Sequence, residues 1–296
     1  MNELLILSRA IHIGSCLVLF SLFVVRLLVE RPAADRGGAA RLLAGVCLVA
    51  AAGSGFLWFW AAVAGMSGSG LKDSLNLQLF QMVIEQTPPG HVWIVRCAIG
   101  VLLGLMLCFS RGAWRWIVGA VLAAMFVGSL AWLGHAGATE GGRRSFMLAG
   151  DVAHLLAASA WPAGLLPFVL LLRHQMKTGA LPAAYAAARR FSAMSLVTVG
   201  VLAASGLVNA FFLVGSFHAL VATDYGRLLI VKLALFAVAA GLGAWNLLVH
   251  EPLMETAPEA LSAMTRKVWI EVALGTLIVV VVAIMGTLPP GSSAGG

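Results

Sequence analysis

The sequence predicts an all-α, polytopic membrane protein that crosses the bilayer with eight transmembrane helices. Of its 296 residues, 61% are hydrophobic and only 10% are charged, whereas a soluble domain carries about 25% charged residues. The chain contains eight apolar segments, and each is long enough to cross a hydrocarbon core of about 30 Å. None alternates with the period of two that marks a transmembrane strand. Helices, which satisfy their own backbone hydrogen bonds in lipid, are therefore expected.

The apolar segments are separated by polar stretches that contain glycine, proline or charged residues. In chain order they are Leu4–Val29, Leu42–Met66, His91–Phe109, Trp114–Ala136, Phe146–Leu172, Phe191–Val214, Tyr225–Val249 and Val268–Leu288. The first segment differs from a signal peptide, because the residues Met1-Asn2-Glu3 before it are not basic and no small-residue cleavage site follows. We expect it to be retained as a helix. In the fifth segment, Trp161-Pro162 predicts a kink, since proline removes one backbone hydrogen bond.

Basic residues predict the orientation of the helices, because cytoplasmic loops of membrane proteins carry an excess of lysine and arginine. With the N-terminus outside, twelve basic residues fall on the cytoplasmic side and four on the other. The twelve are Arg26, Arg31, Arg36, Arg41, Arg111, Arg115, Arg173, Lys177, Arg189, Arg190, Arg266 and Lys267, and the four are Lys72, Arg143, Arg144 and Arg227. We therefore expect a multi-pass membrane protein with both termini facing the periplasm or the cell exterior. The net charge of +7 mostly reflects this excess, and no soluble domain is left to bind nucleic acid.

The chain is interpreted as one integral membrane domain, residues 1–296, built from two halves of four helices, 1–140 and 141–296. Similar short patterns recur in the two halves. They are Arg9-x-x-His12 and Asp151-x-x-His154, Ser54-Gly55 and Ser205-Gly206, and the basic residues Arg96 and Lys232 in the third helix of each half. Because each half has an even number of helices, the two copies of this 4+4 internal repeat would be parallel rather than inverted.

Four histidines are expected to gather in the outer half of the membrane, and they form the predicted metal site. His12 and His154 lie about 12 Å deep in the first helix of each half, and His135 and His91 lie at helix ends on the same side. Ionisable residues within membrane spans are rare and indicate a functional site. Imidazole suits copper, zinc, iron and nickel, and sulfur selects Cu(I). Met147, two turns before His154, is the predicted thioether ligand.

Other polar residues in the spans have more than one interpretation. Asp151 is one turn from His154, where a carboxylate orients a ligand histidine or pairs with a nearby arginine. Arg96 and Lys232 either extend to the membrane surface or hold an anionic group. Glu271 is interpreted as a structural partner of nearby basic residues, Arg266 and Lys267, in preference to a proton relay. The four cysteines form no C-x-x-C pair and are expected to be packing residues.

Two further classes of function remain open. His12 and His154 would suit the axial positions of a b-type haem in an electron-transfer protein, with Arg96 and Lys232 near the propionates. Against this, two-haem cytochromes need histidine pairs near both membrane faces. The third class is a metal-free structural or assembly protein, in which histidines bridge helices through hydrogen bonds. The sequence has no nucleotide-binding motif, so neither ATP-driven pumping nor another enzymatic activity is expected.

The sequence resembles the CopD copper-resistance family of bacterial inner-membrane proteins over nearly its whole length. The matching stretches are Gly134-His135-Ala136, Asp151-x-x-His154 with Trp161, Arg190-Phe191-Ser192, Ser205-Gly206-Leu207-Val208-Asn209-Ala210, Tyr225-Gly226-Arg227-Leu228-Leu229-Ile230-Val231-Lys232, Asn246, Glu271-Val272-Ala273-Leu274-Gly275 and Thr287-Leu288-Pro289-Pro290. Leu247 departs from the family pattern, which has a basic residue there.

The resemblance implies that the chain takes part in copper resistance and homeostasis. Its implied activity is copper transport, in the direction of uptake from the periplasm. The ligand would be a copper ion, Cu(I) or Cu(II), and the implied partner is a periplasmic copper-binding protein. The bilayer is the other expected partner, and no nucleotide is involved.

Overall fold

The computed structural model describes residues 2–31, 38–67, 77–134, 137 and 141–291. Within these ranges, eight helical segments are long and apolar enough to cross a membrane, which confirms the predicted fold class. They are α1 (Asn2–Val24) with its π-helical extension η1 (Val25–Glu30), α2 (Gly38–Ser67), α4 (Pro88–Phe109), α5 (Trp114–Gly128) with η2 (Ser129–Leu133), the pair α6 (Arg143–Ala160) and α7 (Leu165–Lys177), α8 (Leu181–Val214), α10 (Asp224–Trp245) with η4 (Asn246–His250) and α11 (Glu251–Leu253), and α12 (Pro258–Met285).

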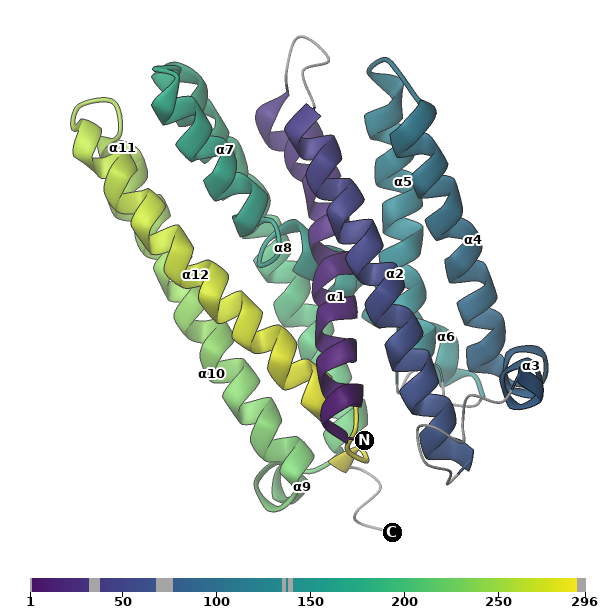
Figure 1. The fold of residues 1–296 in the computed structure, drawn as a ribbon. Coiled ribbons are helices and arrows are strands. Elements are labelled where there is room, and N and C mark those ends of the chain that lie inside the picture. Colours follow the sequence, from purple (N-terminus) through teal and green to yellow (C-terminus); the bar gives the residue numbers. More distant parts are fainter. Residues whose placement is uncertain (1, 32–37, 68–76, 135–136, 138–140, 292–296) are drawn as a thin grey trace.

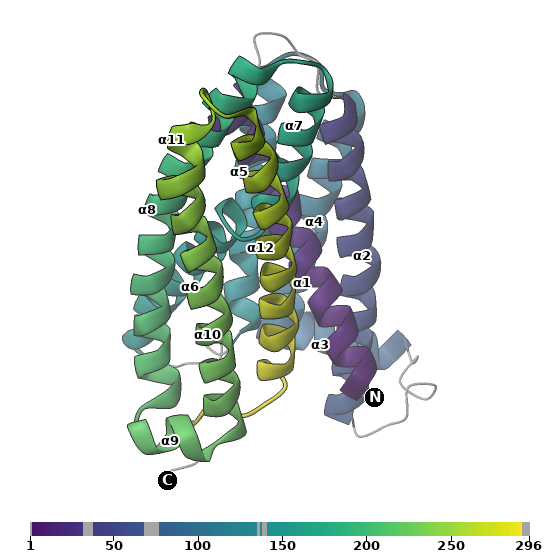
Figure 2. The same ribbon diagram turned by 90° about the vertical axis from the view of Figure 1, so that its left-hand side faces the viewer.

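The helices form an elongated bundle around α1, which packs against α2, α5, α6, α7 and α12 (Figure 1). α1 begins and α12 ends at the same end of the bundle, which we call the terminal end (Figures 1 and 2). Two short helices, α3 (Leu77–Gln86) and α9 (Phe217–Ala222), also lie at that end. Many large apolar side chains are exposed on the outside, among them Leu42, Val49 and Leu207. Such a surface is rare on a soluble protein and fits contact with lipid.

The fifth span is broken where the sequence predicts a kink. α6 ends at Ala160 and α7 begins at Leu165, because Pro162 has no N–H to continue the helix. Gly164 completes the break, since a Cβ at this position would collide with the carbonyl oxygen of Ala160. Pro162 faces α12 at Gly275, where an added Cβ would lie 3.5 Å from the proline carbonyl oxygen.

The sixth span begins ten residues earlier than the apolar pattern predicts, at Leu181 instead of Phe191. The added turns are rich in alanine, the strongest helix former, and Pro182 stands in the first turn, where a missing N–H costs nothing. Ala184, Ala187 and Ala188 are buried in the apolar core with Phe168 and Leu172. The extension is therefore stabilised by tertiary packing that mean hydropathy does not register.

Candidate functional site

His12 is held by the first half of the chain in a fully buried site. Its side chain is 1% exposed. Nδ1 lies 2.8 Å from the carbonyl oxygen of Ala51 on α2, and Nε2 lies 2.6 Å from Nη2 of Arg96 on α4. The rings of Trp58 and Trp93 pack around the imidazole with centroid distances of 5.5 and 5.4 Å.

These two hydrogen bonds fix the protonation state of His12. A carbonyl oxygen only accepts, so Nδ1 must donate to Ala51. A guanidinium only donates, so Nε2 must accept from Arg96. His12 is therefore the neutral Nδ1–H tautomer, and its one lone pair is taken by Arg96.

Cys16 completes this cluster one turn along α1. Its Sγ lies 3.7 Å from Nε2 of His12 and 3.5 Å from Nη2 of Arg96. Nη1 of Arg96 also donates to the carbonyl oxygen of Phe126 at 2.7 Å and to Oγ of Ser129 at 2.6 Å. The imidazole nitrogen and the sulfur thus converge on a buried guanidinium, which stands where a metal ion would need to stand.

His154, in contrast, leaves one ring nitrogen open. Its Nδ1 lies 2.9 Å from Oγ of Ser205 on α8, and that hydroxyl donates its own proton to the carbonyl oxygen of Val201 at 2.6 Å. Ser205 must therefore accept from His154, which makes His154 the Nδ1–H tautomer with its lone pair on Nε2. The backbone carbonyl of Leu202 also accepts from the His154 ring, and in this tautomer a carbonyl can share only the Nδ1 proton. No hydrogen-bond donor to Nε2 is found in the part of the chain that the structure describes.

The His154 side chain lines a cavity of about 170 Å³ between the two halves, near the terminal end. We call it the central cavity. Residues of α1, α2, η2, α6, α8, α10 and α12 line it, and its polar or sulfur-bearing side chains are Arg9, Asp151, His154, Asn209, Tyr225, Lys232 and Met285. Such a group of convergent polar side chains in a concave site is typical of a ligand site.

The charged groups of the central cavity are partly compensated. Nδ2 of Asn209 donates to Oδ1 of Asp151 at 2.6 Å. Nη1 of Arg9 donates to the carbonyl oxygen of Gly286 at 2.8 Å, and its guanidinium lies 5.0 Å from the ring centroid of Trp58. Lys232 also lines the cavity, and no hydrogen bond joins it to His154, which is itself a described residue. Two cations and one carboxylate therefore line the same cavity as His154.

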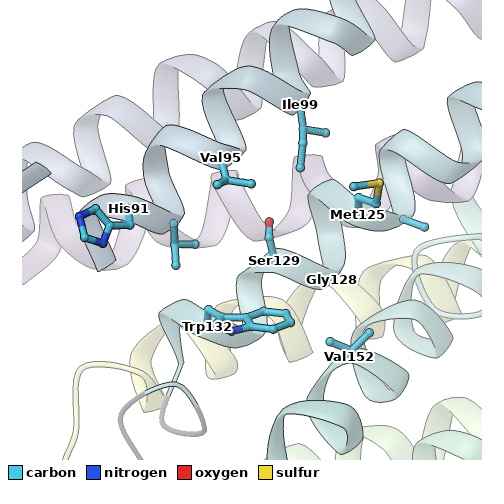
Figure 3. Close-up of a pocket in the computed structure, with 10 residues that line it drawn as sticks. His91, Val95, Ile99, Met125, Gly128, Ser129, Trp132 and Val152 are labelled. Atoms are coloured by element: carbon cyan, nitrogen blue, oxygen red, sulfur yellow. The ribbon is translucent and has the colours of Figure 1, made fainter. Parts of the chain in front are cut away.

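The remaining predicted ligands lie elsewhere. His91 is exposed, and its Nε2 lies 2.9 Å from the carbonyl oxygen of Glu85. It lines an apolar groove of about 570 Å³ whose other lining residues include Trp132 and Val152, and its ring lies at one end of this groove (Figure 3). Met147 is buried against Ala131 and Leu148. His135 falls outside the described residues.

Within the described ranges, His12 and His154 do not contact each other. In the same ranges, no group of three or more His, Cys, Asp or Glu side chains is arranged to bind a metal ion. The prediction of one site shared by both histidines is not tested by this. Sequence reasoning also did not assign Met285, Asn209, Tyr225 and Arg9 to the site. The spacing Arg9-x-x-His12 put the arginine close to a predicted ligand, but only the packing of α12 brings Met285 to the central cavity.

The two histidines differ in the space around them, and glycine substitutions should report this difference. A Cβ at Gly55 would lie 2.9 Å from the His12 ring, which its two hydrogen bonds hold in place, whereas a Cβ at Gly206 would lie 3.6 Å from His154. We expect Gly55→Ala to lower the free energy of unfolding by about 1–3 kcal/mol. Gly206→Ala should leave it nearly unchanged, since it adds only ordinary contact. Denaturant titration in detergent measures both, and equal losses would contradict the difference in packing.

Comparisons with known proteins place this chain in a family. Residues 1–145 match the family model described as the N-terminal domain of copper resistance protein D-like proteins, and residues 185–285 match that of copper resistance protein D. The chain is 30% identical over 227 residues to copper resistance protein D of Pseudomonas syringae pv. tomato, covering 73% of each protein. No solved structure matches.

Two further relatives have related names. The chain is 30% identical over 235 residues to the copper transport protein CutJ of Bacillus subtilis, covering 75% of this chain but only 41% of that longer protein. It is 28% identical to the inner membrane protein YebZ of Escherichia coli, with 78% of each covered. With both halves matched by family models and a relative matched over most of its length, the chain belongs to the copper resistance protein D family.

Proposed function

We propose that this protein binds a copper ion in the central cavity through Nε2 of His154 and passes it across the bacterial inner membrane, in the direction of uptake. The observation that carries the proposal is that His154, whose Nε2 has no hydrogen-bond donor among the described residues, lines a polar cavity between the two halves. We choose copper as the ion because the chain belongs to a copper resistance family and its relative CutJ is named a copper transport protein.

The chemistry of the cavity favours Cu(I) over Cu(II). His154 offers a neutral nitrogen and Met285 a thioether, which is the soft ligand that selects Cu(I). Arg9 and Lys232 already place two positive charges at the cavity against one negative charge on Asp151. A monovalent ion is repelled less than a divalent one in such surroundings. Asp151, one turn before His154, is suited to attract the ion during entry.

The side of the membrane follows from the basic residues. The cavity lies near the terminal end of the bundle, since Arg9 near the start of α1 and Met285 at the end of α12 line it. The twelve-to-four distribution of basic residues supports a periplasmic position for that end. A copper ion would then enter from the periplasmic side, delivered by a periplasmic copper-binding protein. No observation favours haem, since axial ligation needs an open nitrogen on each histidine and Nε2 of His12 is bonded to Arg96.

The sulfur ligand provides the test. We expect the purified protein to bind one Cu(I), with nitrogen and sulfur neighbours in its X-ray absorption spectrum and no Soret band. Met285→Leu should remove the sulfur neighbour and weaken binding by roughly 10–100-fold, measured by competition with a chromophoric chelator. The exchange conserves volume, so the fold should be retained.

Met147→Leu is the matched control, because Met147 is equally buried but lies in a separate apolar cluster. It should leave copper binding unchanged. If the sulfur neighbour is lost in Met147→Leu and kept in Met285→Leu, the thioether ligand is Met147, as the sequence predicts. A wild-type protein that binds no Cu(I) would refute the proposed function.

A further inference from the structure

A second intramembrane polar pair lies far from the central cavity, on α12 and η4. Glu271 is 1% exposed, and its Oε1 accepts a hydrogen bond of 2.8 Å from Nδ2 of Asn246. The nearest cavity-lining residues on the same helices are Val282, 11 positions from Glu271 on α12, and Lys232, 14 positions from Asn246 on α10. At 1.5 Å per residue, the pair is about 16–21 Å from the cavity along the bundle axis, toward the opposite end.

Among the described residues, no cation pairs with Glu271. The sequence suggests Arg266 and Lys267 as partners, and Lys267 stands one turn away, but its ammonium lies 4.6 Å from the ring centroid of Trp245. Arg173 on α7 lies over the ring of Trp269. The other titratable or charged side chains on the elements packed against α12 are Glu3, Arg9, His12 and Cys16 on α1, His174 and Lys177 on α7, Asp224, Tyr225, Arg227 and Lys232 on α10, His250 on η4 and Glu251 on α11. None of these forms an ion pair or hydrogen bond with Glu271 in the described part of the chain.

An unsatisfied oxygen next to Glu271 indicates where its proton resides. Oδ1 of Asn246 is buried and has no hydrogen-bond donor among the described residues. A buried acceptor without a donor is costly, and an ionised carboxylate in the membrane without a cation costs more. Both costs disappear if Glu271 is protonated. An acid and a primary amide then pair through two hydrogen bonds, with the amide N–H donating to one carboxyl oxygen and the carboxyl O–H donating to Oδ1.

The surroundings of the pair are suited to movement. Asn246 begins the π-helical turn η4, and π-helical turns occur frequently at functional sites. A Cβ at Gly243, one turn before it, would lie 3.4 Å from Oε2 of Glu271 and 3.9 Å from Trp161. Trp161 stands at the break between α6 and α7, so the acid lies beside the interrupted span whose α6 segment carries His154.

We propose that Glu271 and Asn246 form a proton-binding site in the half of the membrane opposite the central cavity, and that this site couples copper movement to proton movement. Glu271 holds a proton while no metal is near. It releases that proton to water at the opposite end when a copper cation passes, so that the carboxylate balances the charge of the cation, and it takes up a proton again afterwards. The inference rests on the proposed function for the coupling, but not for the protonation.

Two measurements on the full-length protein test the two parts. Infrared spectra at neutral pH should show a carboxylic-acid C=O band that Glu271→Gln removes and that the exposed control Glu85→Gln keeps. Because glutamine preserves both hydrogen bonds to Asn246, this variant should fold. In vesicles containing a pH-sensitive dye, copper-dependent proton movement should fall on the order of 100-fold in Glu271→Gln, the effect of losing a positioned proton carrier, while copper affinity stays unchanged.

An unchanged acid band in Glu271→Gln would show that Glu271 is ionised and would overturn the proposal. So would wild-type copper-linked proton movement in that variant. A wild-type protein that binds no copper would refute the proposed function and the coupling with it, while the infrared band would still decide whether Glu271 holds the proton.

Discussion

We expect His154→Ala to lower Cu(I) affinity on the order of 100-fold or more, and His12→Ala to leave it nearly unchanged. Loss of groups that merely orient a ligand already costs about 10–100-fold. Among the described residues, His154 is the only histidine that lines the central cavity, and its Nε2 is open. Nε2 of His12 is bonded to Arg96 at 2.6 Å instead. Chelator competition with both purified variants gives the affinities, with the exposed His174→Ala as the control.

The stability of the two variants should show the opposite order. His12 is 1% exposed and its ring is packed by Trp58 and Trp93. His12→Ala therefore leaves a cavity and removes an acceptor from Arg96, which should lower the free energy of unfolding by about 2–4 kcal/mol. His154 is only half-buried and should contribute less. If one ion is shared by both histidines, as the sequence suggests, each single variant will lose most copper and the double variant will add little.

The eight spans were predictable because membrane crossing depends on local properties, namely the length and hydropathy of each apolar run. The break after Ala160 was predictable for the same reason, since Pro162 acts on its own helix. The early start of α8 was missed because alanine packing against α7 stabilises turns that are not strongly apolar.

The side-chain partners were not predictable, because depth in the membrane does not fix the rotation of a helix about its axis. Arg9 and Ile13 of α1 line the central cavity. His12 lies about 60° from Arg9 and about 100° from Ile13 around the helix. It does not line the cavity, and its Nε2 is bonded to Arg96 instead. On α6, Asp151, His154 and Leu155 line the cavity together. Two histidines at equal depth thus acquire different surroundings, one closed by a guanidinium and one open.

Replacement of Arg96 should produce the second large effect, a gain of metal binding. Nε2 of His12 and Sγ of Cys16 both lie within 3.5 Å of Nη2 of Arg96. Arg96→Met removes the charge, frees the nitrogen and the sulfur, and adds a thioether of similar length. Nitrogen and soft sulfur ligands select Cu(I). We expect Arg96→Met, loaded with copper during expression, to bind two Cu(I) per chain where the wild type binds one, as measured by metal analysis of the purified protein.

Two further variants show whether the second ion is held by the first-half cluster. Arg96→Lys keeps a cation at the site and should bind one Cu(I), and Arg96→Met with Cys16→Ser should return to one because the thiol sulfur is lost. The cation–π contact of Arg96 with Phe126, at 4.4 Å, is lost in Arg96→Met, so the variant should also unfold at a lower denaturant concentration. One Cu(I) per folded Arg96→Met chain would mean that the guanidinium only bridges helices and does not occupy the place of a metal ion.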